Sequence, residues 1–171
     1  MIGAGSTSEV YKVFDTNTGR FVAGKKIIMF DEPELSKSIK SELDILCGLE
    51  HPNIVRFYDH SHHHGDIWFF MEYLPETLEM VYRNYGKITE ETARAYTKQL
   101  VSAVKYLHSN KIIHKDIKCS NVLISSEGVL KLSDFGSSKK FDQTNSVAAY
   151  NVNGAMTFKG SVLWMAPEVI R

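Results

Sequence analysis

The sequence predicts an α+β fold in which a strand-rich first half with one helix precedes a mainly helical second half. Residues 1–30 alternate in polarity and are rich in Val, Phe and Ile, which is typical of strands. Apolar residues recur at helical spacing after Thr89, which indicates a long helix in the second half. Because 43% of the 171 residues are hydrophobic, the chain can form a sizeable core.

The first half is expected to contain a sheet and one helix. A turn signal at Asn17-Thr18-Gly19 divides residues 1–30 into a hairpin or meander followed by a third strand. Apolar residues at helical spacing predict a helix over 36–49, and His51-Pro52-Asn53 ends it. The remaining elements of this half are strands at 54–58 and 67–72 and a linker at 74–77.

The second half is expected to be mainly helical. A short helix over 78–85 ends at Gly86, and Thr89 is a suitable N-cap for a longer helix because acidic residues follow it. The apolar residues of the longer helix lie along one face: Ala93, Tyr96, Leu100, Val104 and Leu107. The last predicted elements are a hairpin with strands at 122–124 and 129–132, and a polar, mobile segment at 137–159.

Charge and composition narrow the classes of function. Twenty basic and twenty acidic residues cancel, so nothing favours a nucleic-acid partner. No segment has the apolar length of a membrane span, and no signal peptide is expected. Cys47 and Cys119 have no paired spacing, which argues against a disulfide framework and fits a reducing compartment.

The most informative feature is the segment 114–121, which reads His-Lys-Asp-Ile-Lys-Cys-Ser-Asn and precedes Asp134-Phe135-Gly136. Phosphoryl transfer from ATP needs a carboxylate that orients the attacking hydroxyl and groups that neutralise the phosphate oxygens. Mg²⁺ prefers hard oxygen ligands, so a carboxylate and an amide oxygen suit it. Asp116, Asn121 and Asp134 supply these groups in a fixed order.

This pattern resembles the catalytic loop and the metal loop of protein kinases. The resemblance implies a bilobal protein-kinase-like fold: a β-rich N-lobe over 1–73 with a truncated first strand, then a partial, mainly helical C-lobe over 74–171. It also implies ATP and Mg²⁺ as cofactors, Asp116 as catalytic base, and Asn121 and Asp134 as the metal ligands.

Three motifs of the first half match the same family. The segment 3–10 follows the phosphate-covering glycine loop, and the strand that comes after it, in place of a helix, disfavours a dinucleotide-binding fold. The segment 21–26 fits the strand of the phosphate-binding lysine, where register favours Lys25 over Lys26. Glu42 is its natural helix partner. Each motif alone has a structural alternative: a glycine turn, an edge-strand lysine or a solvated glutamate.

The family likeness assigns further residues. Lys118 would neutralise the transferred phosphate, as is typical of serine/threonine kinases, and Ser161 replaces the threonine that positions Asp116 and Lys118. Met71 would be the gatekeeper beside adenine. The residues implied for ATP binding are Gly3, Gly5, Val10, Ala23, Lys25, Met71, Glu72, Leu74 and Leu123.

The segments 51–56, 96–100 and 164–170 resemble the MAP kinase kinase kinase group. This implies a cytoplasmic signalling enzyme with a protein substrate, a downstream MAP kinase kinase; the upstream activator is not identified. Ala166-Pro167-Glu168 is typical of kinases that act on peptides, which disfavours a small-molecule substrate. Because the family's fold continues past this motif, the chain is expected to be truncated, and the long helix to lack neighbours. The competing function is an inactive, pseudokinase-like interaction module.

Three departures from the family pattern affect expectations. Ser8 replaces a loop glycine, and Gly24 removes an apolar side chain beside Lys25, which should loosen that strand. Lys115 replaces the arginine that clamps an activation-segment phosphate, and lysine cannot make the bidentate contact. Candidate phosphosites are Ser137, Ser138, Thr144, Ser146 and Thr157.

Two further groups of residues are singled out. The His-rich segment 60–64 has neither a cysteine nor a clear fourth ligand, so a solvated loop is expected rather than a metal site. The family likeness also implies that a stack of side chains joins the two lobes, formed by Leu46, Phe57, His114 and Phe135.

Overall fold

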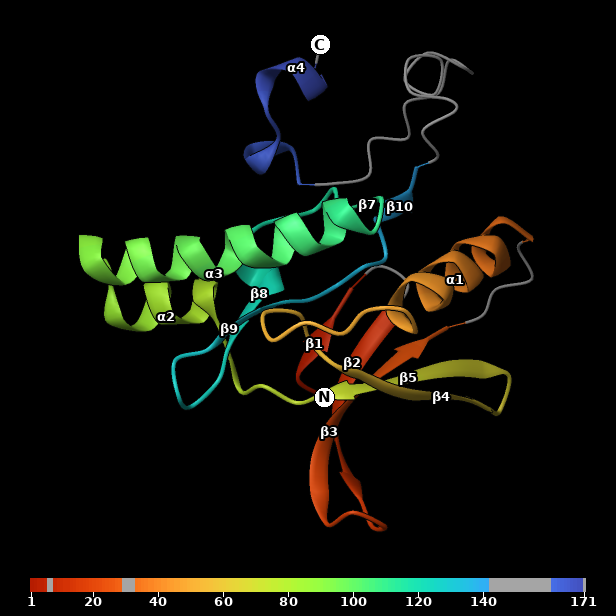
Figure 1. The fold of residues 1–171 in the computed structure, drawn as a ribbon. Helices are drawn as coiled ribbons and strands as arrows, with labels where there is room; N and C mark the ends of the chain where they lie inside the picture. Colours follow the sequence, from red (N-terminus) through yellow and green to blue (C-terminus); the bar gives the residue numbers. More distant parts are fainter. Residues whose placement is uncertain (6–7, 29–32, 142–160, 171) are drawn as a thin grey trace.

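The computed structural model describes residues 1–5, 8–28, 33–141 and 161–170 and shows two parts, a sheet with helix α1 and a helical part (Figure 1). The strands are β1 (Gly3–Ala4), β2 (Ser8–Asp15), β3 (Arg20–Ile27), β4 (Phe57–His63), β5 (Asp66–Glu72), β6 (Glu76–Thr77), β7 (Ile112–Ile113), β8 (Val122–Ile124), β9 (Leu130–Leu132) and β10 (Lys139–Lys140). The helices are α1 (Pro33–Leu46), α2 (Leu78–Tyr85), α3 (Glu90–Ser109) and α4 (Pro167–Ile170), with short 3₁₀ turns at Cys119–Asn121 and Val162–Trp164.

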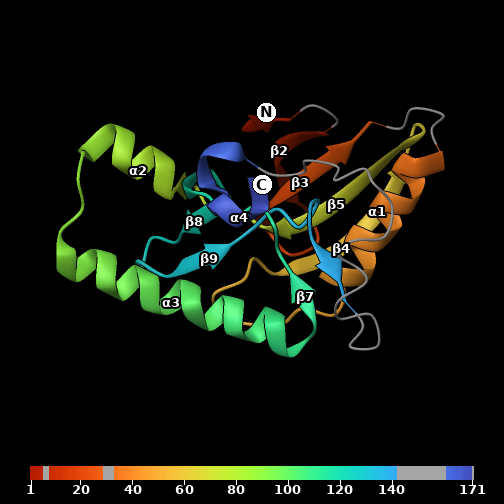
Figure 2. The same cartoon turned by 90° about the horizontal axis from the view of Figure 1, so that it is seen from above.

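The first part is an antiparallel sheet of five strands in the order β1-β2-β3-β5-β4. The predicted turn after β2 is confirmed: Gly19 has φ +68°, and its N–H donates to the Asp15 carbonyl over 2.9 Å. The Asp15 carboxylate also accepts from Asn17 and Thr18, which makes the loop self-supporting. Helix α1 lies beside β4 and β5 in both views (Figure 1, Figure 2).

The hairpin of β4 and β5 differs from expectation. The strand predicted at 54–58 is wrong in extent, because Ile54 makes only an isolated bridge to Leu132 and β4 continues to His63. The His-rich segment is therefore strand and turn rather than loop, with positive φ at His64 (52°) and Gly65 (86°), as a two-residue hairpin turn requires. Since β4 is an edge strand, most of its side chains meet solvent and an apolar pattern is not needed.

Helix α1 ends earlier than the predicted residue 49. The N–H of Gly48 bonds to the Ile45 carbonyl over 3.1 Å and that of Leu49 to the Leu46 carbonyl over 3.3 Å, a tighter turn that closes the helix. Leu49 keeps the helical spacing of the stripe and is 8% exposed, although it lies outside the helix. Leu49 is therefore buried although it is not part of the helix.

The sheet is not loosened at Gly24. A Cβ atom there would lie 2.9 Å from Val13 Cγ2 and 3.3 Å from the Trp68 ring. Tyr11 and Phe70 pack on either side of Trp68, with ring centroids 5.6 Å and 6.4 Å away. Side chains from the neighbouring strands fill the space that a residue larger than glycine would occupy.

The segment between α1 and β4 joins the two parts of the molecule. Asn53 is 8% exposed and donates through its amide nitrogen to Gln99 of α3 and to the Leu130 carbonyl, both over 2.9 Å. The same Gln99 oxygen accepts from the Leu130 N–H over 2.9 Å. In the backbone, the Val55 N–H donates to the Leu132 carbonyl, and the Leu132 N–H donates to the Asn53 carbonyl. The end of α1 is thus fixed to the helical part.

The helical part agrees with the sequence at its helix ends. Thr77 and Thr89 cap α2 and α3 through their side chains, and Gly86 with φ +80° ends α2. The expectation that α3 lacks neighbours is wrong in its second half, because Ala103 and Leu107 are at most 1% exposed. The half-buried face nearer its start borders a 130 Å³ apolar pocket lined by Leu78, Ile88, Ala93, Tyr96, Thr97, Leu100, Val122 and Leu130.

Three very short strands were not predicted. Glu76–Thr77 of the expected linker pairs with β8 as β6, and β7 pairs with β10 through Ile112 and Ile113. Each pairing joins residues far apart in the sequence, so no local pattern indicates it. The predicted boundary at residue 73 falls in the connection from β5 to β6.

One buried cluster runs through both parts and includes Ile45, Leu46, Phe69, Leu107 and Phe135. The predicted stack of four side chains lies in or against it: the rings of His114 and Phe135 are 4.9 Å apart, and Phe57 packs on the cluster. Within the described ranges, no helix is both long and apolar enough to cross a membrane. The segment predicted to be mobile, 137–159, is described only as far as residue 141, and there Ser138 is buried and Lys139–Lys140 form β10. The rest of that segment, with the candidate phosphosites Thr144, Ser146 and Thr157, lies outside the described residues.

We expect Gly24→Ile to lower the free energy of unfolding by about 1–3 kcal/mol, because the new side chain overpacks Val13 and Trp68. Urea unfolding followed by circular dichroism measures this change. In a Trp68→Ala background the same Gly24→Ile change should cost less, since the smaller residue vacates the space that the new side chain would enter. A more stable Gly24→Ile single variant would contradict the packing described.

Candidate active site

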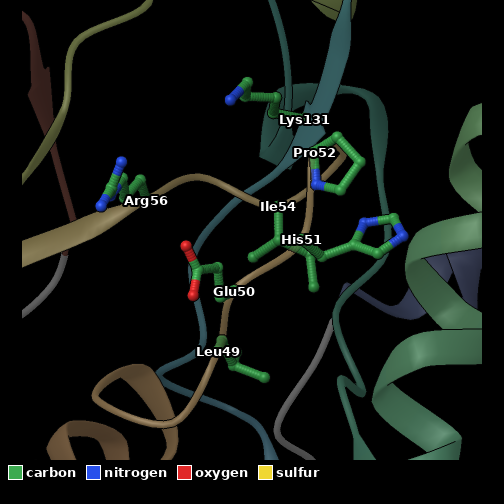
Figure 3. Close-up of a pocket in the computed structure, with 7 residues that line it drawn as sticks. All are labelled: Leu49, Glu50, His51, Pro52, Ile54, Arg56 and Lys131. Atoms are coloured by element: carbon green, nitrogen blue, oxygen red, sulfur yellow. The ribbon is translucent and has the colours of Figure 1, made fainter.

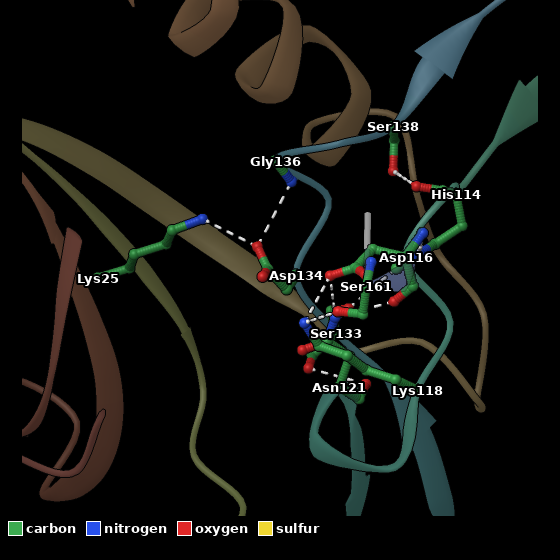
Figure 4. Close-up of polar contacts among 10 residues, drawn as sticks. All are labelled: Lys25, His114, Asp116, Lys118, Asn121, Ser133, Asp134, Gly136, Ser138 and Ser161. Carbon is green, nitrogen blue, oxygen red and sulfur yellow. Dashed lines mark hydrogen bonds and ion pairs between the residues drawn. The ribbon is translucent and has the colours of Figure 1, made fainter. Parts of the chain in front are cut away.

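The centre of the candidate site is an ion cluster around Lys25. Its ammonium lies 2.7 Å from Glu42 Oε1 and 3.2 Å from Asp134 Oδ1 (Figure 4 shows the Asp134 contact). The neighbouring Lys26 pairs instead with Asp66, over 3.0 Å, because successive strand residues face opposite sides of the sheet. The structure therefore brings together three of the predicted residues, which come from β3, from α1 and from the segment after β9.

Backbone geometry places Asp134 in this cluster. Asp134 has φ +61°, a conformation that non-glycine residues seldom adopt. Its Oδ1 also accepts from the Gly136 N–H over 3.4 Å. A Cβ atom at Gly136 would lie 3.4 Å from both Asp134 Oδ1 and Glu42 Oε2, so glycine leaves room for the two carboxylates.

The charges in the cluster support each other. Burial lowers the pKa of Lys25, but Glu42 and Asp134 outweigh burial and hold that pKa above its usual value. Desolvation likewise raises the pKa of Asp134, and the Lys25 charge and hydrogen bond more than compensate, so that pKa is below its usual value. At neutral pH the ammonium and the Asp134 carboxylate are therefore both charged.

A second polar cluster surrounds Asp116 (Figure 4). Asp116 Oδ2 accepts from Lys118 and from the Asn121 amide, both over 2.9 Å, while Oδ1 accepts from the Ser161 N–H over 3.0 Å. Lys118 also donates to the Ser161 hydroxyl over 2.7 Å. Desolvation raises the pKa of Asp116, but hydrogen bonds from Lys118 and Ser161 bring it below its usual value, so Asp116 is ionised at neutral pH.

The donor set fits a magnesium ion in its chemistry. Both hydrogen bonds recorded for the Asn121 side chain use its nitrogen, toward the carbonyl and the carboxylate of Asp116. That arrangement leaves the amide oxygen for a cation. The Oδ2 of Asp134 is likewise uninvolved in the bonds to Lys25 and Gly136. A carboxylate and an amide oxygen are hard ligands of the kind that Mg²⁺ takes when phosphates supply the others.

His114 and Ser138 hold the two loops together. The His114 ring bonds to the Ser133 carbonyl over 3.0 Å and packs edge-on against Phe135. Burial lowers the pKa of His114, so the ring is neutral at pH 7. The Ser138 hydroxyl is buried and donates to the His114 carbonyl over 3.2 Å. Ser138, named as a candidate phosphosite, is thus inaccessible in this conformation.

The residues predicted to hold ATP occupy one face of the sheet and the strands beside it. Val10 lies opposite Lys25 and Ala23 lies opposite Met71, which places these four on the same face. Gly3 pairs with Val10 in β1, and Gly5 closes a turn to Ser8 with a bond of 2.7 Å. Leu74 is buried directly after β5, and Leu123 lies on β8 opposite Thr77.

The side chain of Glu72 turns away from that face. Its Oε2 accepts from Lys131 of β9 over 2.8 Å and from the Arg56 N–H over 3.3 Å. Lys131 and Arg56 border a 290 Å³ pocket that contains none of the residues predicted for ATP (Figure 3). The pocket's other lining residues are Leu49, Glu50, His51, Pro52 and Ile54. The Glu72 side chain therefore contacts residues at the join between the two parts, and its backbone N–H donates to the Arg56 carbonyl over 2.8 Å.

Sequence reasoning missed the residues that support the site. Gln99 and Lys131 each make contacts between parts that are distant in the chain. Gln99 lies in the segment 96–100, for which only a family likeness and no role was predicted, and Lys131 belongs to no short motif. The available signal for Gln99 was that a polar residue lies beside the apolar face of the long helix. Nothing local distinguishes Lys131 from a solvated lysine.

No group of three or more His, Cys, Asp or Glu side chains in the described part of the chain is arranged to hold a metal.

The sequence profile of the protein kinase domain matches residues 1–171. The chain belongs to the protein kinase domain family, and its sheet, helix α1 and helical part are those of the kinase fold.

Similar proteins are MAP kinase kinase kinases. The chain is 37% identical over 174 residues to mitogen-activated protein kinase kinase kinase 1b of Physcomitrium patens, which covers 99% of the chain and 22% of the relative. It is 37% identical over 177 residues to mitogen-activated protein kinase kinase kinase 3 of Homo sapiens, covering 99% and 28%. Mitogen-activated protein kinase kinase kinase A of Dictyostelium discoideum is 35% identical over 178 residues, covering 100% and 18%. The chain thus spans less than a third of the length of these relatives.

We expect Lys25→Met to lower the free energy of unfolding by about 3–5 kcal/mol, because it leaves the mostly buried Glu42 carboxylate without a counter-charge. Urea unfolding at pH 7 provides the measurement. The matched control is Lys26→Met, which removes a more exposed pair on the other face of β3 and should cost about 1 kcal/mol or less. Equal losses in the two variants would contradict the assignment of the buried pair to Lys25.

Acid should weaken the fold through Asp116 and Asp134. Their pKa values in the folded protein lie below the unfolded value of 3.8, so their contribution to stability is complete above that pH. It is lost as the pH falls through the folded pKa values. Unfolding free energies between pH 2 and pH 7 should therefore decrease less steeply below about pH 4 for Asp134→Asn than for the unchanged chain. Parallel curves would contradict the pairing with Lys25.

Proposed function

We propose that this protein transfers the terminal phosphoryl group of ATP to serine or threonine residues of a protein substrate, with Mg²⁺ as cofactor. One observation carries the proposal: the Lys25 cluster and the Asp116 cluster provide, in one molecule, cations for phosphates, ligands for Mg²⁺ and an ionised base. Family membership supports the same reaction class.

In this mechanism, Asp116 accepts a hydrogen bond from the substrate hydroxyl and receives its proton. The hydroxyl oxygen forms a bond to the γ-phosphorus of ATP while the bond from that phosphorus to the bridging oxygen breaks, and ADP leaves with that oxygen. The Ser161 N–H and Lys118 hold the carboxylate in place, since each bonds to a different oxygen of Asp116. Lys118 then balances the negative charge on the phosphoryl oxygens during transfer. The depressed pKa of Asp116 keeps it ionised, so it acts mainly by orienting the hydroxyl.

Lys25 binds the inner phosphates, and Glu42 fixes the direction of the ammonium. Asn121 and Asp134 would hold Mg²⁺, which would supply positive charge against the phosphate groups. Adenine lies against Val10 and Ala23 of the sheet, beside Met71, with Leu123 opposite. The backbone of Glu72 and Leu74 binds its edge, which agrees with the Glu72 side chain pointing to Lys131.

The substrate class follows from the relatives. Proteins named as MAP kinase kinase kinases match nearly the whole chain, which supports a MAP kinase kinase as the phosphorylated protein. The free cysteines Cys47 and Cys119 support a reducing compartment, in agreement with a cytoplasmic location. A non-catalytic interaction module is the alternative. Such modules lack a phosphate-binding lysine, a base or a metal ligand, whereas Lys25, Asp116 and Asp134 are all present and connected.

The first test of the proposal is nucleotide binding and phosphoryl transfer by the purified chain. Mg²⁺-ATP at about 100 times its dissociation constant should stabilise the fold by roughly 2.7 kcal/mol in thermal unfolding. Asp134→Asn should lose the magnesium-dependent part of this stabilisation. Asp116→Asn should keep it and reduce kcat toward a protein substrate by about 10²- to 10⁴-fold.

The control is Asp59→Asn, which changes a carboxylate on β4 that is 80% exposed. Its nucleotide binding and kcat should equal those of the unchanged chain. Binding without transfer in the unchanged chain would favour the interaction module. Absence of nucleotide binding in a cooperatively folded chain would contradict the proposed function.

A further inference from the structure

We infer that Lys12, Phe21 and Tyr73 form a cation–π clasp that controls how fast nucleotide leaves the site, an inference that rests on the proposed ATP binding. The Lys12 ammonium lies 4.1 Å from the centroid of the Phe21 ring and 4.8 Å from that of the Tyr73 ring. Both distances are within the range in which a cation is attracted to a ring face. One ammonium thereby joins β2, β3 and the segment after β5.

The clasp lies beside the residues proposed to hold adenine. Lys12 is directly opposite Ala23 in the pairing of β2 with β3, and Phe21 is two residues before Ala23 on the same face. Tyr73 stands between Glu72 and Leu74, whose backbone is proposed to bind the adenine edge. The clasp therefore connects the sheet face proposed to carry adenine with the segment proposed to bind the adenine edge.

The partners of Lys12 differ from those of other strand lysines. Lys25, Lys26 and Lys131 each contact a carboxylate, within 2.7 to 3.0 Å. In the described part of the chain no ion pair is recorded for Lys12, and its partners are uncharged rings. Phe21 stays 53% exposed and packs edge-on against Phe14. Because rings leave the ammonium charge uncompensated, the clasp attracts an anionic nucleotide while it holds the sheet.

The clasp restrains the movement that nucleotide release needs. Backbone pairing joins β3 to β5 as far as Val22 opposite Glu72, whereas β2 pairs only with β1 and β3. The Lys12 side chain is the recorded contact between β2 and Tyr73, so its loss leaves β2, which carries Val10, freer to move relative to the segment after β5. Two exposed cation–π contacts correspond to roughly a five- to thirtyfold change in an equilibrium, which bounds the effect on release.

The test measures the dissociation of a fluorescent N-methylanthraniloyl derivative of ATP, with Mg²⁺, by stopped flow. Lys12→Met keeps the length of the side chain and removes the charge, and should accelerate dissociation about fivefold or more. Lys12→Arg retains the cation and should release the probe at nearly the original rate. The control is Lys139→Met, an exposed strand lysine with no ring contact among the described residues. Unchanged dissociation from Lys12→Met would overturn the inference.

A second measurement does not depend on nucleotide. The urea midpoints of Lys12→Met, Tyr73→Leu and the double variant form a double-mutant cycle. The double variant should lose less than the sum of the single losses, because either change breaks the same contact; additive losses would overturn the clasp. Failure of the unchanged chain to bind the probe would overturn the proposed ATP site and the control of release with it. Normal binding with unaltered release would overturn the clasp alone.

Discussion

The arrangement of this kinase domain depends on the positive charge of Lys25. Glu42 is 17 residues from it in the chain and Asp134 is 109 residues from it, and the two carboxylates meet at its ammonium. Two negative groups so close together repel each other unless a cation lies between them. Because each comes from a different element, the sheet, helix α1 and the metal loop can pack in this way only while the ammonium is present.

A second constraint acts on the segment that follows helix α1. Asn53 and Gln99 connect the segment after the helix to α3 and to β9 through buried hydrogen bonds. Breaking one such bond leaves a buried polar group unsatisfied, which costs more than the bond itself contributes. Glu42 is therefore positioned by the ion pair within the site and by the amide contacts behind it.

In the Asp116 cluster, unlike the Lys25 cluster, hydrogen-bond donors surround a single carboxylate. Both oxygens of Asp116 are already engaged by donors, so the carboxylate has one orientation before any substrate arrives. Ser161 takes part through its backbone N–H, which any residue other than proline would supply, and through its hydroxyl, which serine shares with threonine. The Ser161 hydroxyl accepts a hydrogen bond from Lys118. The two lysines of the site therefore have separate partners. Lys25 pairs with the acidic residues of its own cluster, and Lys118 contacts Asp116 and Ser161.

The sequence by itself determined the features that short segments encode. The turn at Asn17-Thr18-Gly19 and the caps of α2 and α3 depend on neighbours a few residues away. The segments 114–121 and 134–136 could likewise be singled out from their own residues. Only the tertiary structure decided the extent of β4, the pairing of β6 with β8, and the packing of the Trp68 ring into the space beside Gly24. Those features depend on strands and rings that are distant in the chain, so their physical cause, packing against a remote surface, leaves no periodic pattern in the sequence.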